Sequence, residues 1–232
     1  MPSTPIQRPV DFLTKEELGF LLHCCREHFP TWYHFISLLV KTGLRIGEAL
    51  ALEWADIDFH GRFIQINKTA DRGGIGSPKN GKSRRVDMSL GLAHTLKGLR
   101  VAQGKQALQQ GGPAPGLLFP TRAGRLLDRA SVYRNIWDPF LKKAGFRQIH
   151  THDLRHPFAS RLIQNGESLA YVKEQLGHAS IKMTVDVYGY LVPGGNEQAV
   201  DRLDGLEEAT IRNQGRRAES QDRLTWCHNK KK

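Results

Sequence analysis

The amino-acid sequence predicts an α+β fold that is mainly α-helical and contains a small antiparallel β-sheet. Apolar residues recur every three or four positions over residues 14–54 and again over 128–189, which is the repeat of amphipathic helices. Between these regions, residues 57–66 alternate apolar and polar side chains, which is the repeat of a half-buried strand. With 232 residues, the chain can bury a sizeable core as one ordinary domain or two small ones.

Three helices are predicted in the N-terminal part, after an extended lead over residues 1–12 that carries three prolines. They cover residues 14–29, 31–41 and 45–54. Thr14 begins the first helix, and Glu17 follows at the spacing of a capping box. Gly43 is suited to end the second helix, because glycine adopts the left-handed cap conformation at little cost.

The small sheet is predicted in the middle of the chain. Apolar positions two apart lie on both sides of His60-Gly61, which predicts a hairpin over 57–66. Residues 84–88 predict a further strand. Residues 70–82 carry four glycines and one proline and are expected to form a flexible turn region. A long helix is predicted over 89–106.

The C-terminal half is predicted to be helical from residue 128 onward. Pro139 is expected to kink or restart the first of these helices, because proline lacks an N–H donor and crowds the preceding turn. Further helices are predicted over residues 152–164, 168–176 and 180–189. Ser168 and Ser180 stand at the N-cap positions of the last two.

The charge of the chain is the first indication of its function. The formal net charge is +11, and residues 62–105 hold ten basic and two acidic side chains. Residues 194–232 hold eight basic and seven acidic side chains, so the surplus does not come from the C-terminal end. A basic surplus inside a folded region indicates a surface that binds a polyanion such as nucleic acid.

The composition also excludes several classes of protein. No window approaches the roughly 18 uninterrupted apolar residues of a membrane-spanning helix, and the start of the chain has no apolar run typical of an export signal. The three cysteines lack C-x-x-C spacing, which fits a reducing compartment and argues against a disulfide framework or a zinc ribbon. A cytoplasmic protein is therefore expected.

The densest group of reactive side chains lies at residues 151–156, with the sequence Thr-His-Asp-Leu-Arg-His. His152 and Arg155 are three apart at a predicted helix start, so they share one face. The free N–H groups of a first helical turn and the planar fork of an arginine both suit a phosphate. A histidine can also move a proton near neutral pH, so the group favours phosphate chemistry.

Other motifs stand in a defined order around this group. They are Thr-Gly-Leu-Arg-Ile-Gly-Glu at residues 42–48, a basic turn at 79–86, Leu-Gly-His ending at His178, and Tyr188 ten residues later. Together these motifs resemble the tyrosine recombinase family, which comprises the phage integrases and their bacterial relatives. The resemblance spans roughly residues 12–205 and implies the tyrosine recombinase catalytic-domain fold over residues 13–212.

The resemblance implies six catalytic residues: Arg45, Lys79, His152, Arg155, His178 and Tyr188. Tyr188 is the implied nucleophile, which forms a covalent 3′-phosphotyrosine link to DNA. Arg45 and Arg155 are implied to clamp the equatorial oxygens of the phosphorane, because catalysis of this exchange is mainly stabilisation of charge by fixed donors.

The remaining three residues are implied to donate or move protons. His178 donates a further hydrogen bond to the phosphorane, and His152 assists as the base for the tyrosine proton. Lys79 is the implied general acid that protonates the departing 5′ oxygen. The family's chemistry implies no metal and no cofactor, and it needs no ATP because the ester energy is kept in the tyrosine link.

Two of these assignments have competitors. Lys82 lies in the same basic turn as Lys79 and competes for the acid role. Tyr190 competes with Tyr188 as the nucleophile, although residues two apart cannot share one helical face. His156 is expected to pack its helix against neighbouring elements rather than to catalyse.

Charged residues near the motifs receive supporting roles. Glu48 lies three residues beyond Arg45 on the same helical face and is expected to orient its guanidinium. Arg84, Arg85 and Lys97 are expected to hold the DNA backbone.

The chain departs from the family pattern at Pro157, where relatives usually have threonine. Proline inside a helix costs roughly 3 kcal/mol, and the disturbance could displace His152 and Arg155. The cost falls if the helix begins later, since the first turn lacks N–H partners anyway. Because the catalytic pattern begins by Leu13, the N-terminal core-binding domain of full-length relatives is expected to be absent.

The expected protein is a site-specific DNA recombinase or integrase of the bacterial cytoplasm, associated with the nucleoid. Its expected partners are double-stranded DNA and other copies of itself in a synaptic tetramer. The alternative is a catalytically impaired DNA-binding remnant of an integrase. A last amphipathic segment at 196–212 either packs on a neighbouring protomer or folds back on its own domain, and residues 213–232 are expected to form a polar, flexible tail.

Overall fold

The computed structural model describes residues 13–71, 74–78, 81–192, 197 and 200–201. The chain divides into two units, residues 1–191 and 192–232, and the first unit contains the elements discussed below. Four sequence-based expectations lie outside the described residues: the lead at 1–12, the placement of Lys79, most of the segment at 196–212, and the tail at 213–232.

The N-terminal helices follow the sequence signals closely. They are α1 (Lys15–His28), α2 (Pro30–Thr42) and α3 (Ile46–Leu50). The capping box is present, since Glu17 N–H donates to Thr14 Oγ1 at 3.2 Å and Thr14 N–H donates to Glu17 Oε2 at 2.8 Å. Gly43 ends α2 with φ of 60°, in the left-handed region. The third helix is shorter than predicted, and a separate 3-10 turn follows at Trp54–Asp56.

The predicted antiparallel sheet is confirmed. Its strands are β1 (Ile57–Asp58), β2 (Phe63–Ile66) and β5 (Arg84–Asp87), in the order β1-β2-β5. Ile64 pairs with Ile57 on one side and with Val86 on the other. The helix α4 (Leu90–Gln109) follows β5 and is capped by Ser89.

The expectation of a flexible turn over residues 70–82 was wrong for its first half. A second hairpin forms there from β3 (Thr69–Asp71) and β4 (Gly74–Gly76), with Ala70 opposite Ile75. The glycines are compatible with this pairing, because backbone hydrogen bonds need no side chain. The hairpin lies close to α3, where a Cβ on Gly47 would be only 2.6 Å from the Ala70 carbonyl oxygen.

Pro139 restarts a helix, as its sequence position predicts. The path runs through α5 (Arg129–Val132), a π-helical turn (Tyr133–Trp137) and α6 (Asp138–Lys143). The wider turn ends where Asp138 N–H donates to the Tyr133 carbonyl. Because proline crowds the carbonyl four residues before it, a wider turn at this point relieves the clash.

The last helices form the region that contains the reactive motifs. A 3-10 turn (Thr151–Leu154) leads into α7 (Arg155–Gln164), followed by α8 (Leu169–Leu176), α9 (Ile181–Tyr188) and a 3-10 turn (Gly189–Leu191). Ser168 and Ser180 cap α8 and α9 as predicted. Pro157 is the third residue of α7. It lies in the first turn, directly after the 3-10 turn, where its missing N–H costs less than in the interior of an α-helix.

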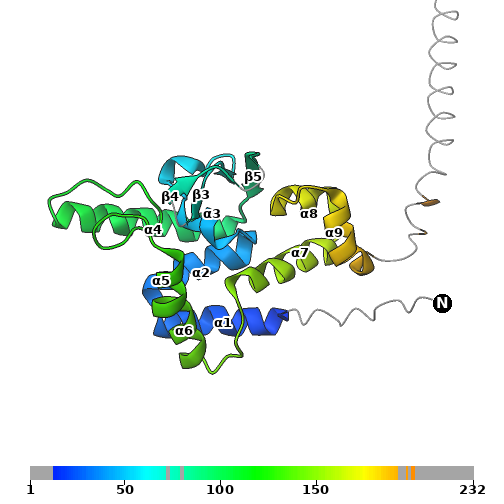
Figure 1. Ribbon diagram of the computed structural model, residues 1–232, viewed down its shortest axis with the longest axis horizontal. Helices are drawn as coiled ribbons and strands as arrows, with labels where there is room; N and C mark the ends of the chain where they lie inside the picture. The colour runs from blue at the N-terminus through cyan, green and yellow to red at the C-terminus, as the bar shows by residue number, and fades with distance from the viewer. Residues whose placement is uncertain (1–12, 72–73, 79–80, 193–196, 198–199, 202–232) are drawn as a thin grey trace, which may run out of the picture. The chain divides into compact units, whose positions relative to one another are not determined.

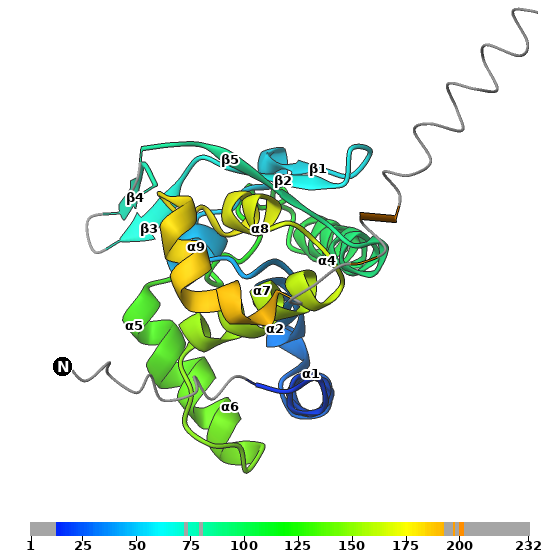
Figure 2. The same ribbon diagram turned by 90° about the vertical axis from the view of Figure 1, so that its right-hand side faces the viewer.

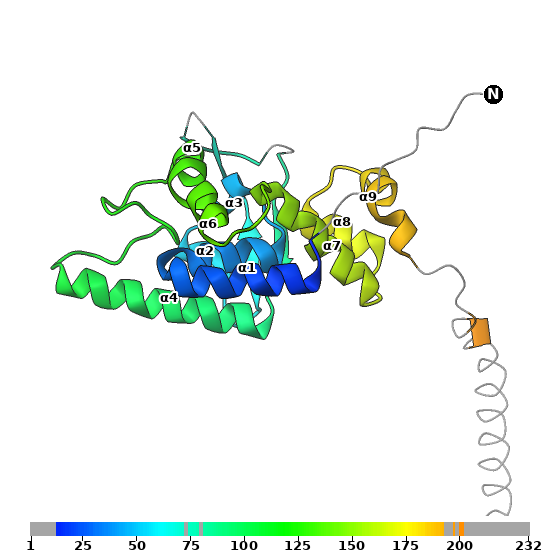
Figure 3. The same cartoon turned by 90° about the horizontal axis from the view of Figure 1, so that it is seen from below.

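Two hydrophobic cores hold the first unit together. The larger is built from α1, α2, the three-stranded sheet, α4 and the α5–α6 region, and the smaller from α7, α8 and α9. In Figures 1 and 3, α4 extends to the side opposite α7, α8 and α9. The view in Figure 2 brings α8 and α9 to the front, with α7 and α2 behind them.

Gly43 lies where the two cores meet. A Cβ at this position would be 2.7 Å from Phe158 Cδ1 on α7 and 3.3 Å from Leu176 on α8. The absence of a side chain therefore allows both the left-handed cap of α2 and the close approach of the smaller core.

We expect Gly43→Ala to destabilise the fold by about 2–4 kcal/mol, because it adds a steric clash to the cost of a left-handed alanine. Gly145→Ala is the matched control, since Gly145 has φ of 61° but open space around its Cβ position. The control should lose only about 1 kcal/mol. Urea unfolding of both variants tests this, and equal losses would contradict the proposed close packing at Gly43.

Candidate active site

Arg155 is the buried centre of the site. It is the first residue of α7 and is 2 % exposed. Its Nη1 donates to the Gly43 carbonyl at the end of α2, and its Nη2 donates to the Leu176 carbonyl at the end of α8, at 2.7 Å. These two bonds join the two cores and use two of the five N–H donors of a guanidinium.

Arg45 is held at the start of α3 by Glu48, as the sequence predicts. Its backbone N–H donates to Glu48 Oε2 and its Nη1 donates to Glu48 Oε1, both at 3.0 Å. The Arg45 side chain is 34 % exposed. The guanidinium is thus fixed on one side and accessible on the other.

Glu48 binds a second arginine that the sequence analysis had placed elsewhere. Arg84 on β5 donates from both terminal nitrogens to the two Glu48 oxygens at 2.8 Å. Its Nε donates to the Gln175 carbonyl at 3.1 Å. The expectation that Arg84 holds the DNA backbone is corrected, because its guanidinium is occupied by a buried carboxylate.

The Glu48 carboxylate stays charged because its partners outweigh its burial. Burial by itself would raise the pKa of Glu48, but the hydrogen bonds and positive charges of Arg84 and Arg45 lower it to about 2. A charge-assisted, bidentate pair of this kind fixes both distance and orientation. Glu48 therefore positions Arg45 and, through Arg84, the end of α8.

The turn after α8 carries His178. A Cβ on Gly177 would be 2.8 Å from Arg84 Nε, so the turn lies directly against that arginine. His178 Nδ1 is 3.0 Å from the buried hydroxyl of Thr184 on α9. Burial, together with the charges of Arg155 and Arg45, lowers the pKa of His178 to about 4, so its imidazole is neutral at physiological pH.

His152 lies in the 3-10 turn before α7, on the exposed side of the site. The pKa of His152 is lowered, mainly because its protein neighbours remove part of its hydration. The charges of Arg155, His156 and Arg45 act in the same direction. The same groups that surround His178 thus also act on His152, which indicates that the two imidazoles share one electropositive environment.

Tyr188 ends α9 and is 2 % exposed, whereas Tyr190 is 67 % exposed. The Tyr188 hydroxyl is 3.0 Å from His156 Nδ1. Burial raises the pKa of Tyr188 to about 12, although Arg155 acts in the opposite direction. The hydroxyl is therefore protonated at neutral pH and lies within the electrostatic range of Arg155.

Of the two candidate lysines, Lys79 lies outside the described residues and Lys82 is exposed. Five of the six predicted site residues are thus described, and each of those five either pairs with or changes the pKa of another member: Arg45, His152, Arg155, His178 and Tyr188.

The assembled site is strongly electropositive. The guanidiniums of Arg45 and Arg84 bind the Glu48 carboxylate, and that of Arg155 lies within its electrostatic range. Burial and the nearby Arg45 lower the pKa of Arg155 to about 9. A buried excess of positive charge is relieved by an anion with several oxygens, such as a phosphate. Within the described part of the chain, no group of three or more His, Cys, Asp or Glu side chains is placed to hold a metal ion.

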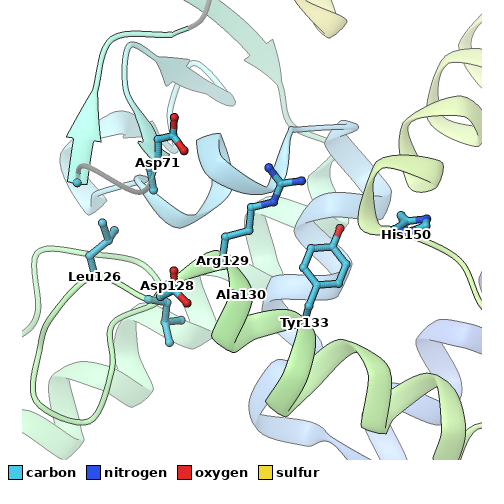
Figure 4. Close-up of a pocket in the computed structure, with 10 residues that line it drawn as sticks. Asp71, Leu126, Asp128, Arg129, Ala130, Tyr133 and His150 are labelled. Atoms are coloured by element: carbon cyan, nitrogen blue, oxygen red, sulfur yellow. The ribbon is translucent and has the colours of Figure 1, made fainter.

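A cavity of about 710 Å³ lies next to this site, between the β3–β4 hairpin and the chain leading into α5. Figure 4 shows Asp71 on the hairpin side and Asp128, Arg129 and Tyr133 on the helix side. The Tyr133 hydroxyl is 2.6 Å from Thr151 Oγ1, beside the turn that carries His152. Among the described lining residues of this cavity, none is Arg45, His152, Arg155, His178 or Tyr188.

Comparison with known proteins establishes the family. A model described as the phage integrase family matches residues 11–191. The chain belongs to this family, that of the tyrosine recombinases. The ICEBs1 integrase of Bacillus subtilis (strain 168) is 32 % identical over 183 residues, which cover 77 % of this chain.

Solved structures confirm the expected fold. The catalytic domain of bacteriophage HP1 integrase superposes with a TM-score of 0.56 at 24 % identity, covering 82 % of this chain and 93 % of that domain. XerH site-specific recombinase, bound to difH substrate in a pre-cleavage complex, superposes with a TM-score of 0.59 at 26 % identity. That match covers 77 % of this chain and 49 % of the XerH chain.

The chain spans about half the length of the curated relatives it matches, 49 % for the ICEBs1 integrase. No helix among the described residues of this integrase-family chain is both long and apolar enough to span a membrane.

Two residues of the site could have been found from sequence patterns. Arg84 and the buried Val86 are two residues apart on β5. Side chains two apart on a strand point to the same face of the sheet, so Arg84 is expected on the inner face. His156 is one helical turn beyond His152 and so faces the same way. Their partners, Glu48 and Tyr188, lie 36 and 32 residues away along the chain, and that separation hid the contacts.

We expect Glu48→Gln to lower the free energy of unfolding by about 3 kcal/mol at pH 7, because the Glu48 pKa is about 2 in the folded chain and ordinarily 4.5. A lowered pKa stabilises the fold above the ordinary value, so the difference between variant and parent should shrink as the pH falls from about 4.5 towards 2. Urea unfolding at pH 7, 5, 4 and 3 measures it.

The control for Glu48→Gln is Glu53→Gln, which weakens a half-exposed ion pair with Lys68. Because this pair remains accessible to water, its loss should cost only about 1 kcal/mol. A Glu48→Gln difference that stays constant across this pH range would contradict the buried-carboxylate account.

Proposed function

We propose that this chain catalyses site-specific DNA strand exchange, cleaving and rejoining DNA through a covalent 3′-phosphotyrosine at Tyr188, without metal or ATP. The observation that carries the proposal is the joint position of Tyr188 and Arg155. A buried phenol lies at the end of α9 within the electrostatic range of a buried guanidinium. A nucleophile beside fixed cations is what phosphoryl transfer requires.

The proposed chemistry is an in-line exchange at one phosphodiester. Tyr188 Oη attacks the phosphorus, and the bond from phosphorus to the 5′ oxygen breaks. Arg45 and Arg155 bind the non-bridging oxygens, whose charge grows in the phosphorane. His178, held through Nδ1 by Thr184, donates from its other ring nitrogen to the same oxygens. Rejoining is the reverse reaction, with a 5′ hydroxyl attacking the phosphotyrosine.

The alternative of an impaired DNA-binding remnant rests on Pro157, and the local structure weighs against it. Pro157 lies in the first turn of α7, directly after the 3-10 turn at Thr151–Leu154, where a missing N–H costs less than in the interior of an α-helix. Arg155 keeps both of its backbone acceptors at the ends of α2 and α8. These contacts support the strand-exchange proposal over the impaired remnant.

Double-stranded DNA is the proposed partner. The XerH chain, 26 % identical, is bound to its difH substrate, and the basic surplus of the present chain is concentrated around its sheet and α4. Arg85 lies over the Phe63 ring at 4.5 Å and Lys97 over the Phe59 ring at 5.6 Å. The aromatic rings hold these exposed cations in position by cation–π contacts. Positive charges fixed in this way can bind the phosphates of the DNA backbone. Assembly of copies into a synaptic tetramer stays a prediction.

We expect the chain to become covalently attached to DNA, and Tyr188→Phe to abolish the attachment because it removes the attacking oxygen. The probe is a pool of duplexes of randomised sequence with one nick each, so that cleavage releases a short 5′-hydroxyl fragment and traps the adduct. Denaturing gels count adducts, and sequencing identifies the captured duplex. Tyr190→Phe is the control, and adducts that persist in Tyr188→Phe but vanish in Tyr190→Phe would contradict the assignment.

We expect Lys79→Ala to slow cleavage by roughly 100- to 10,000-fold, because the departing 5′ oxygen then lacks its proton donor. A captured duplex whose scissile 5′ oxygen is replaced by sulfur should restore the rate, since a thiolate leaves without a proton. Lys82→Ala is the matched control from the same turn. If Lys82→Ala shows the loss and the rescue instead, the acid is Lys82.

A further inference from the structure

His156 contacts the proposed nucleophile directly. It follows Arg155 in the first turn of α7, and its Nδ1 is 3.0 Å from the Tyr188 hydroxyl oxygen. The two rings are 5.8 Å apart between centroids. This contact joins α7 to the last residue of α9 across the smaller core.

The groups around His156 keep its imidazole neutral. Burial lowers the pKa of His156, and Arg155 acts in the same direction while Asp153 opposes them. Tyr188, on the facing helix, carries its proton at neutral pH because burial raises its pKa. A neutral ring has one nitrogen with a free lone pair, so the phenol O–H can donate to Nδ1.

His152, for which the family resemblance implies the role of base, occupies a different position. It is exposed, and its ring meets the ring of His156 edge-on at 6.2 Å between centroids. His156 thus contacts His152 on one side and Tyr188 on the other. The histidine whose nitrogen lies within hydrogen-bond distance of the nucleophile is therefore His156.

We propose that His156 is a catalytic residue: its Nδ1 accepts the Tyr188 proton as the tyrosine oxygen attacks the phosphorus. This inference rests on the proposed strand-exchange function. The O–H bond of Tyr188 breaks and an N–H bond forms on His156, while the oxygen–phosphorus bond forms and the bond to the 5′ oxygen breaks. The 5′ oxygen takes its proton from Lys79. In the rejoining step His156 returns the proton to Tyr188.

The transfer accompanies the attack and does not precede it. The buried phenol is a weak acid and the buried imidazole is a weak base, so an isolated proton transfer is uphill. As the oxygen–phosphorus bond forms, the phenol becomes more acidic, and Arg45 and Arg155 stabilise the charge that moves onto the phosphoryl oxygens. With the Tyr188 proton assigned to His156, His152 does not need to act as the base. His152 lies on the exposed side of the site and can bind the phosphate there.

The decisive variant is His156→Asn, measured by single-turnover adduct formation on the duplex captured from the randomised pool. The asparagine amide oxygen replaces Nδ1 as a hydrogen-bond acceptor but does not accept a proton. We expect cleavage to slow by roughly 100-fold or more, with unchanged duplex binding in gel shifts. His23→Asn, at an exposed position on α1, is the matched control and should keep the parent rate.

Two further readouts separate proton transfer from a structural role. In His156→Gly, added imidazole should restore part of the rate, because a free base can occupy the vacated space. With the sulfur-substituted duplex, His156→Asn should stay slow while Lys79→Ala recovers, since sulfur removes the need for an acid but not for a base.

The outcomes distinguish this inference from the proposed function. If the parent chain captures no duplex at all, strand exchange itself is overturned. If the parent cleaves and His156→Asn cleaves equally fast, the role of His156 is overturned. A slow His156→Asn without imidazole rescue in His156→Gly, together with recovery of His156→Asn on the sulfur-substituted duplex, would also overturn it.

Discussion

The Glu48 carboxylate accepts four hydrogen bonds from two arginines, and the geometry of the site depends on it. Arg45, at the start of α3, and Arg84, on β5, each donate two of these hydrogen bonds. The three neighbouring guanidiniums of Arg45, Arg84 and Arg155 repel one another, and the single negative charge of Glu48 offsets part of that repulsion. Since Arg84 also binds the end of α8, the same carboxylate links the sheet to the turn that carries His178. The site retains an excess of positive charge that a phosphate is suited to neutralise.

Arg155 has a second organising role, because it is both a structural link and a member of the site. Its two backbone acceptors are the carbonyls of Gly43, the C-cap residue of α2, and of Leu176, the last residue of α8. The two helices belong to different hydrophobic cores. Such carbonyls lack helical partners and need donors. The cost of burying this cation is met partly by these bonds. Stability and the proposed phosphate recognition therefore depend on the same side chain. The close approach of α7 and α8 to Gly43 brings this side chain to the Gly43 carbonyl.

The sequence predicted most of the fold from local rules. The capping box at Thr14, the left-handed cap at Gly43 and the serine caps of α8 and α9 all involve residues within four positions of each other, so local spacing was sufficient. The β3–β4 hairpin was missed because its glycines indicate a turn in isolation, and only its packing beside α3 orders the strands. Pro139 was expected to kink or restart its helix, but the π-helical turn that accommodates it needs the surrounding core.

By itself, the sequence determined the family pattern: six candidate residues in a characteristic order, a basic surplus around the sheet, and Glu48 as the partner of Arg45. The tertiary structure decided what each side chain touches. Arg84 binds Glu48, which is 36 residues away in the sequence, and does not lie free on the outer surface. His156 contacts Tyr188, which is 32 residues away in the sequence. The physical reason is that spacing along one helix or strand fixes only which face a residue occupies, whereas contacts between elements depend on how two cores pack together. The partner of the proposed nucleophile therefore becomes visible only after α7 and α9 are packed.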